Sequence, residues 1–232
     1  MNSAVGVVLA VATGDVDYES VFNFEQGVRL TSETLMQTGD SQQNGARKAR
    51  RLKVGTVVEP RELLDIHGGP IQIPDPDRMV HLQFRRFAGC PICKLHLRSI
   101  AARHEELVVA GIREVAVFHS STEALRKHDG ALPFSVIGDP ERHLYMAFGV
   151  ERSARSLLDP RAWGAIVHGL AVFGPGPPDR GESGLGLPAE FLIAPGGRVI
   201  ACKYGIHADD HWSVDELLRL VSSEASRSST PS

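Results

Sequence analysis

The stretch that decides the fold runs from residue 79 to residue 94 and reads MVHLQFRRFAGCPICK. Its first part, Met79 to Phe84, combines β-branched and large apolar residues, which predicts a buried strand. After Cys90, apolar residues recur at helical spacing as far as Leu107, and this pattern predicts a helix. The two cysteines of the stretch, Cys90 and Cys93, therefore lie where a strand passes into a helix.

The remainder of the chain alternates strand and helix patterns. Strands are predicted at 115–118 and 134–137, helices at 122–128 and 142–148, a hairpin at 190–193 and 198–201, and a last helix at 214–221. Ser213 and Glu216 have the spacing of a capping box for that last helix. An inserted helix at 162–173 and a Gly/Pro loop at 174–178 interrupt the alternation. The order predicts an α/β domain with a mixed central sheet flanked by helices.

Length and composition limit the class of protein. The 232 residues are 42% hydrophobic, carry a formal net charge of -3 and have a mean hydropathy of -0.10, which fits one globular domain. No strong basic field is present, so we expect no nucleic-acid partner. The apolar run 5–12 is too short to span a membrane and no basic residue precedes it, so we expect neither a membrane anchor nor a signal peptide.

Both ends of the chain have polar, weakly periodic sequences. Residues 1–50 include a polar stretch and a basic cluster at 47–51, and we expect a poorly ordered extension that the fold does not need. Residues 222–232 are rich in serine and predict a disordered tail. The predicted redox domain therefore covers residues 52–221.

The C-x-x-C spacing of Cys90 and Cys93 predicts thiol chemistry. A cysteine at a helix N-terminus is stabilised as the thiolate, the form that attacks, by the helix dipole and by unpaired backbone N–H groups. Pro91 suits the first helical turn, and Arg86 is a candidate to lower a cysteine pKa. We expect Cys90 to attack, because it comes first at the exposed helix start, and Cys93 to resolve the product as a disulfide.

The same spacing also serves zinc sites, so a metal is the main alternative. The nearest histidine pair, His207 and His211, follows more than a hundred residues later, which excludes a compact zinc knuckle. We therefore expect no metal and no cofactor, with a zinc site built from distant segments as the alternative, and a solvated surface turn at 207–211. Three cysteines in this pattern favour a reducing compartment, which predicts a cytoplasmic protein. Cys202 is expected to be structural, with a second resolving thiol as the alternative.

Four segments together resemble the peroxiredoxin-like branch of the alkyl hydroperoxide reductase/thiol-specific antioxidant (AhpC/TSA) family. The segments are 84–93, 117–121, 139–150 and 187–197. The resemblance spans about 52–221 and implies a thioredoxin-like fold, antioxidant or oxidoreductase activity and a nucleophile at Cys90 or Cys93. It also implies a peroxide or disulfide substrate and a thiol reductant, either a thioredoxin-type protein or a low-molecular-weight thiol.

The sequence departs from that family at the motif P-x-x-x-T/S-x-x-C. Counting back from Cys90 gives Phe87 and Gln83, and counting back from Cys93 gives Cys90 and Arg86. Three functions therefore stay open, namely a thiol–disulfide oxidoreductase, a hydroperoxide reductase, and a redox-sensing or partner-binding module that uses segments 47–51 and 174–178. Pro188 lies just before a predicted strand, where thioredoxin-like folds place a cis-proline beside the active cysteine, and we expect a cis bond there.

Overall fold

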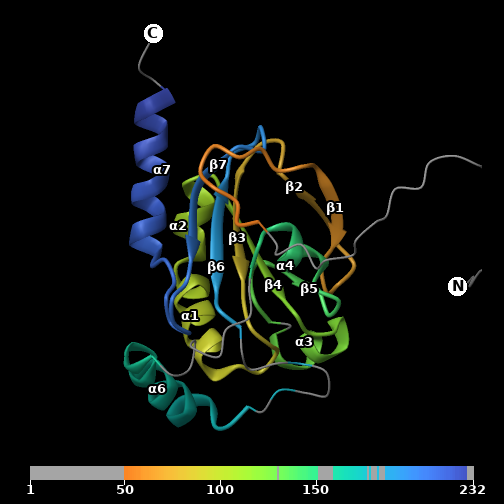
Figure 1. Cartoon of the computed structure of the whole chain (residues 1–232), viewed down its shortest axis with the longest axis vertical. Helices are drawn as coiled ribbons and strands as arrows, with labels where there is room; N and C mark the ends of the chain where they lie inside the picture. Colours follow the sequence, from red (N-terminus) through yellow and green to blue (C-terminus); the bar gives the residue numbers. More distant parts are fainter. Residues whose placement is uncertain are drawn as a thin grey trace, which may run out of the picture. The chain divides into compact units, whose positions relative to one another are not determined.

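A five-stranded sheet forms the centre of the protein in the computed structural model (Figure 1). The structure describes residues 50–129, 131–150, 159–176, 178, 182 and 186–228. The predicted N-terminal extension lies outside these residues except for Arg50, and of the basic cluster 47–51 only Arg50 and Arg51 are described.

The sheet is mixed, as predicted. Its strands are β3 (Met79–Phe84), β4 (Ile112–Phe118), β5 (Ser135–Gly138), β6 (Ala189–Ile193) and β7 (Val199–Tyr204). They lie in the order β5-β4-β3-β6-β7, with β3 parallel to β4 and antiparallel to β6. A separate hairpin, which the sequence patterns did not predict, pairs β1 (Arg61–Leu64) with β2 (Pro70–Ile73).

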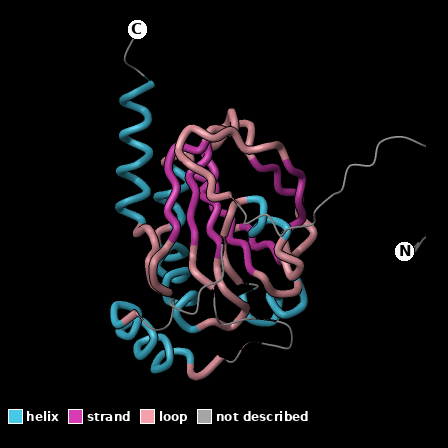
Figure 2. Tube along the Cα trace, viewed as in Figure 1, coloured by secondary structure: helices cyan, strands magenta, loops and turns pink. Residues whose placement is uncertain are grey.

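Helices surround the strands (Figure 2). They are α1 (Pro91–Ala102), α2 (His104–Val109), α3 (Thr122–Asp129), α4 (His143–Ala147), the 3₁₀ turn η1 (Pro160–Ala162), α6 (Trp163–Phe173) and α7 (Val214–Ser228). In the part of the chain that the structure describes, no helix is both long and apolar enough to cross a bilayer.

Two predicted helices differ in extent. The helix expected from Cys90 to Leu107 is divided at Arg103, whose φ of -119° is not helical. The last helix does not end at 221, because α7 continues to Ser228 and residues 222–228 are helical rather than disordered. Serine hydroxyls in this segment donate to carbonyls four residues back, as Ser222 does to Leu218 at 2.8 Å. Glu224 is buried and pairs with Arg198, which fixes the helix to the strand hairpin.

The two faces of the sheet have different linings. One face packs aromatic and aliphatic residues against α4 and the β1–β2 hairpin, among them Phe84, Phe148 and Phe191. The other face lies against α1, α2 and α7, and Ile100, Leu192 and Leu217 pack there. Because side chains alternate along a strand, β3 turns His81 and Gln83 toward α1 while Val80, Leu82 and Phe84 point the other way.

Candidate active site

The cysteine pair lies at the start of α1, next to the end of the central strand. Cys90 is the N-cap residue and Pro91 is the first residue of the helix, where its missing N–H costs nothing. The backbone N–H of Cys93 points at the sulfur of Cys90, with an N···Sγ distance of 3.4 Å. Both cysteines are free thiols, and their exposed fractions are only 1% and 2%. The predicted strand-to-helix placement of the pair is confirmed.

Arg86 supplies a positive charge beside both thiols. Its Nη2 donates to the Sγ of Cys90 at 3.0 Å, and the residue is only 4% exposed. Since it is buried, its charge is poorly screened by water and interacts with both sulfur atoms. The structure thus brings Arg86 to the pair, as the sequence suggested.

The two cysteines have opposite pKa shifts. Burial alone would raise the pKa of Cys93, but a hydrogen bond with Cys90 and the charges of Arg86 and Arg85 outweigh it and hold that pKa well below its usual range. Burial and the neighbouring Cys93 raise the pKa of Cys90 well above its ordinary value. This arrangement fits one shared negative charge, held on Cys93 and stabilised by the thiol of Cys90.

Helix α6 and the segment after it cover the pair. Cys90 and Cys93 share a small apolar cluster with Ala162, Ala165 and Ile166. A Cβ at Gly169 would lie 3.0 Å from the carbonyl carbon of Pro91, and one at Gly176 would overlap the carbonyl oxygen of Gly89. The cover therefore depends on two glycines that let the backbones approach each other closely.

A buried polar network lies under α1, on the same face of the sheet. Arg85 donates to Glu190 at 2.9 Å and to Gln83 at 3.1 Å, and all three side chains are buried. At the other end of the network, Glu114 accepts from Gln83 and contacts His81 at 2.8 Å. Isolated charges are costly to bury, so these two carboxylates persist in the core only because cations and donors surround them.

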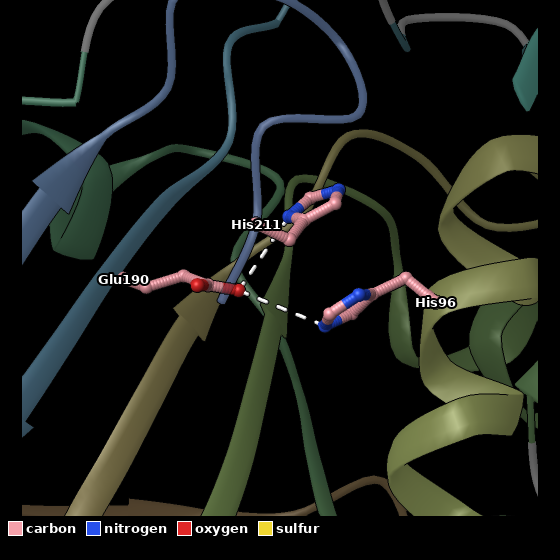
Figure 3. Close-up of side chains that lie close together, drawn as sticks. All are labelled: His96, Glu190 and His211. Carbon is pink, nitrogen blue, oxygen red and sulfur yellow. Dashed lines mark ion pairs between the residues drawn. The ribbon is translucent and has the colours of Figure 1, made fainter. Parts of the chain in front are cut away.

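Three members of the network have donor types that suit a metal. Figure 3 shows His96 on α1 and His211 pointing toward Glu190, with ring-nitrogen to Oε1 distances of 3.8 and 3.5 Å. The guanidinium of Arg85, however, already contacts Glu190 and His211. A cation placed among the three donors would be repelled by this fixed positive charge at close range. The cluster therefore fits a hydrogen-bonded network better than a metal centre.

The charge of Arg85 determines how the network titrates. Burial would raise the pKa of Glu190, but Arg85 and His211 hold it well below the usual range, so Glu190 is ionised. Burial and Arg85 lower the pKa of His96 and of His211, which favours neutral imidazoles. The expected solvated turn at 207–211 is wrong for His211, because this residue is enclosed by Arg85, Glu190 and the ring of His96, whose centroid lies 4.3 Å away.

The expected cis bond at Pro188 is also wrong. Among the described residues, the cis peptide is Ile73–Pro74, and the bond before Pro188 is trans. The carbonyl of Pro188 accepts from Gly205 at 2.9 Å, which extends the antiparallel pairing of β6 with β7 by one step. Regular strand pairing thus sets the backbone at Pro188.

Cys202 lies away from the pair. It is on β7, half-buried against the apolar cluster that packs under α4, on the face of the sheet opposite α1. Its sulfur is 3.7 Å from the carbonyl oxygen of Leu52. The sheet separates it from Cys90 and Cys93, which favours the structural interpretation over a second resolving thiol.

Comparisons with known proteins agree with this fold. The model of the AhpC/TSA antioxidant enzyme family matches residues 99–207, a range that begins after the cysteine pair. No curated protein matches the chain. Among solved structures, the peroxidoxin BcpB of Mycobacterium tuberculosis is 18% identical with a TM-score of 0.55, and the match covers 75% of this chain and 98% of that one. AhpC of Mycobacterium bovis is 15% identical with a TM-score of 0.54, covering 77% and 95%.

A mutant of peroxiredoxin 6 of Arenicola marina is similar at 14% identity and a TM-score of 0.56, covering 77% of this chain and 76% of that one. These structures share the thioredoxin-like arrangement of strands and helices seen here. Residues 99–207 thus match the AhpC/TSA antioxidant enzyme family, and the fold is similar to that of the solved peroxiredoxins.

Proposed function

We propose that the protein is a thiol-dependent oxidoreductase in which Cys93 is the attacking thiolate and Cys90 resolves the product. The observation that carries this proposal is the buried pair at the start of α1, with Arg86 Nη2 at 3.0 Å from the sulfur of Cys90 and its charge acting on both thiols. The sequence alone favoured Cys90 as the nucleophile. The positive charges of Arg85 and Arg86 around Cys93 favour the reverse order.

With a peroxide, the reaction is a two-step redox change. The Cys93 thiolate forms a bond to one peroxide oxygen, the O–O bond breaks, and the leaving alkoxide takes a proton from water. The sulfur is now a sulfenic acid. The Cys90 thiol attacks this sulfur, its proton leaves with the hydroxyl group as water, and a Cys90–Cys93 disulfide forms.

With a disulfide substrate, the same pair works by exchange. The Cys93 thiolate attacks one substrate sulfur and expels a thiolate, and Cys90 then displaces the second substrate sulfur to give the same internal disulfide. A disulfide is bulkier than a peroxide, so its access to the pair requires α6 to move away from Pro91. We propose a reducing compartment such as the cytoplasm, because a C-x-x-C pair among only three cysteines is typical of redox sites there.

Turnover assays with hydrogen peroxide and with a model disulfide test this function. We expect Cys93→Ser to abolish both reactions and Cys90→Ser to stop turnover after the first step, with Cys93 left as the sulfenic acid or a mixed disulfide. Cys202→Ser is the matched control and keeps full activity, since the sheet separates it from the pair. Full turnover in Cys93→Ser would refute the assignment.

A further inference from the structure

A groove of about 390 Å³ runs along α1 from Lys94 to Ala101. Its polar lining consists of Lys94, Arg98 and His128, and its apolar lining includes Leu97 and Phe173. None of the described residues that line it is acidic. The groove is therefore suited to an anionic ligand.

Both long cations of the groove are held in place by an aromatic ring. The Nζ of Lys94 lies 5.9 Å, and the Cζ of Arg98 4.3 Å, from the centroid of the Phe173 ring. Among the described residues, neither cation pairs with a carboxylate. Stacking on a ring orients a guanidinium while its N–H donors stay available, and these donors match a carboxylate.

The cationic side chains of the groove lie along the row of α1 that starts at Cys90, whereas Leu97 and Ala101 continue the row of Cys93. Cys90, Lys94 and Arg98 follow each other at four-residue spacing, so they share one face of α1, with a rise of about 6 Å per step. His128 lies beside Gly89, since a Cβ on that glycine would be 3.6 Å from its ring. Cys93 instead shares a face with His96, above the buried network.

We propose that this groove binds the reductant, a small thiol that carries a carboxylate, and delivers its sulfur to Cys90. The inference rests on the proposed function, because it needs the Cys90–Cys93 disulfide as its target. The thiolate of the reductant forms a bond to the sulfur of Cys90, the Cys90–Cys93 bond breaks, and Cys93 leaves as a thiolate. A second reductant thiolate then attacks the first one's sulfur, releasing its disulfide and the thiolate of Cys90.

The direction of attack follows from the surroundings of the two sulfur atoms. A thiol with a lower pKa is the better leaving group in disulfide exchange, and Arg86 and Arg85 lower the pKa of Cys93. Attack at Cys90 therefore expels the favoured thiolate, and His128 of the groove lies beside Gly89, the residue before Cys90. A carboxylate bound there also competes with Phe173, the last residue of the covering helix α6, for Lys94 and Arg98.

The test measures how fast three small thiols reduce the oxidised full-length protein. The probes are 3-mercaptopropionate, 2-mercaptoethanol and cysteamine, which carry a negative, a neutral and a positive group. Each rate is divided by the rate of the same thiol with a small neutral disulfide, which removes differences in intrinsic nucleophilicity. At low ionic strength we expect the anionic thiol to be favoured over the neutral one by roughly tenfold.

Variants connect this preference to the groove. Lys94→Gln combined with Arg98→Gln is expected to bring the ratio of the normalised rates, anionic thiol over neutral thiol, close to one. Because both thiols react with the same variant, this ratio cancels any general change in access to Cys90. Arg219→Gln removes an exposed charge from α7 and is expected to keep the native ratio. An unchanged ratio in the double variant would overturn this inference but leave the proposed function standing. If no Cys90–Cys93 disulfide forms with peroxide or a model disulfide, the proposed function fails and the inference fails with it.

Discussion

The two neighbours Glu190 and Phe191 show how the two faces of the sheet differ. They are adjacent on β6 and both are fully buried, yet they point to opposite faces. Phe191 packs edge-on against Phe84, Phe148 and Tyr204. Glu190 pairs with Arg85 below the cysteine helix. One face of the sheet thus provides stability through apolar packing, and the other uses part of its buried area to hold charge near the sulfur atoms of Cys90 and Cys93.

Truncating the apolar face is expected to have the largest effect on stability. Phe191→Ala removes a fully buried ring and leaves a cavity, which costs about 3–5 kcal/mol of unfolding free energy. Chemical denaturation measures this loss, with the exposed Val57→Ala as the control. If the folded variant also altered the pH dependence of cysteine alkylation, the two faces would not be separable.

A slightly smaller loss of stability, which depends on pH, is expected for Glu190→Gln. The change leaves the buried guanidinium of Arg85 without its carboxylate and costs about 3 kcal/mol at neutral pH. Because the pKa of Glu190 is lowered by folding, its stabilising effect is present above the ordinary pKa of glutamate and is lost as the pH falls toward the lowered pKa. Denaturation at neutral and at acidic pH should therefore show the gap between native and variant closing in acid.

Glu190→Gln is also expected to change the reactivity of the thiols, whereas Phe191→Ala is expected to leave it unchanged. Without the negative charge of Glu190, the positive charge of Arg85 acts more fully on Cys93 and lowers its pKa further. The alkylation rate should therefore keep its neutral-pH value down to a lower pH than in the native protein. The pH profile of alkylation by iodoacetamide measures this. Identical profiles in the two proteins would show that the network does not reach the cysteine.

Arg86→Gln is expected to affect reactivity more than stability. Removing the guanidinium raises the pKa of Cys93 and slows alkylation at neutral pH on the order of tenfold. The native rate should stay constant through neutral pH and fall only in acid, where the thiolate of Cys93 is protonated. The variant rate should instead rise with pH in the alkaline range. Arg219→Gln, with the same change of charge on α7, serves as the control.

The smallest effect of the series is expected for Cys202→Ser. This half-buried thiol lies on the apolar side of the sheet, so its replacement should change the unfolding free energy by less than about 1 kcal/mol and leave alkylation of the pair unchanged. Mass spectrometry of the alkylated protein distinguishes the three thiols. A slower reaction at Cys93 in this variant would show that the two faces are coupled.

Local patterns in the sequence predicted most of the described elements. The strand at 79–84 and the helix start at Pro91 depend on neighbouring residues, which the sequence displays directly. Ser213 and Glu216 form the predicted capping box, with Ser213 N–H donating to Glu216 at 2.7 Å. The prediction of a disordered tail was wrong for residues 222–228, because serine hydroxyls that donate to carbonyls four residues back and the pairing of Glu224 with Arg198 extend the helix.

The buried network was missed, although the sequence contains a signal for it. Glu190 stands in the apolar strand AEFLI, and His81 and Gln83 alternate with apolar residues in the central strand. A charged residue in a buried strand indicates a buried partner. Its partners, however, come from other elements, Arg85 from the end of β3 and His211 from the loop before α7, and no sequence spacing connects them.

The sequence by itself determined the α/β order and the placement of Cys90 and Cys93 at a helix start, and it is the basis for proposing that pair as the chemical group, because these features depend on residues close together in the chain. Only the tertiary structure decided which charges surround each sulfur, that Pro188 is trans, and that α6 covers the pair. Those features depend on contacts between distant segments. Electrostatic effects on a thiol depend on the burial and distance of every nearby charge, and folding alone fixes both.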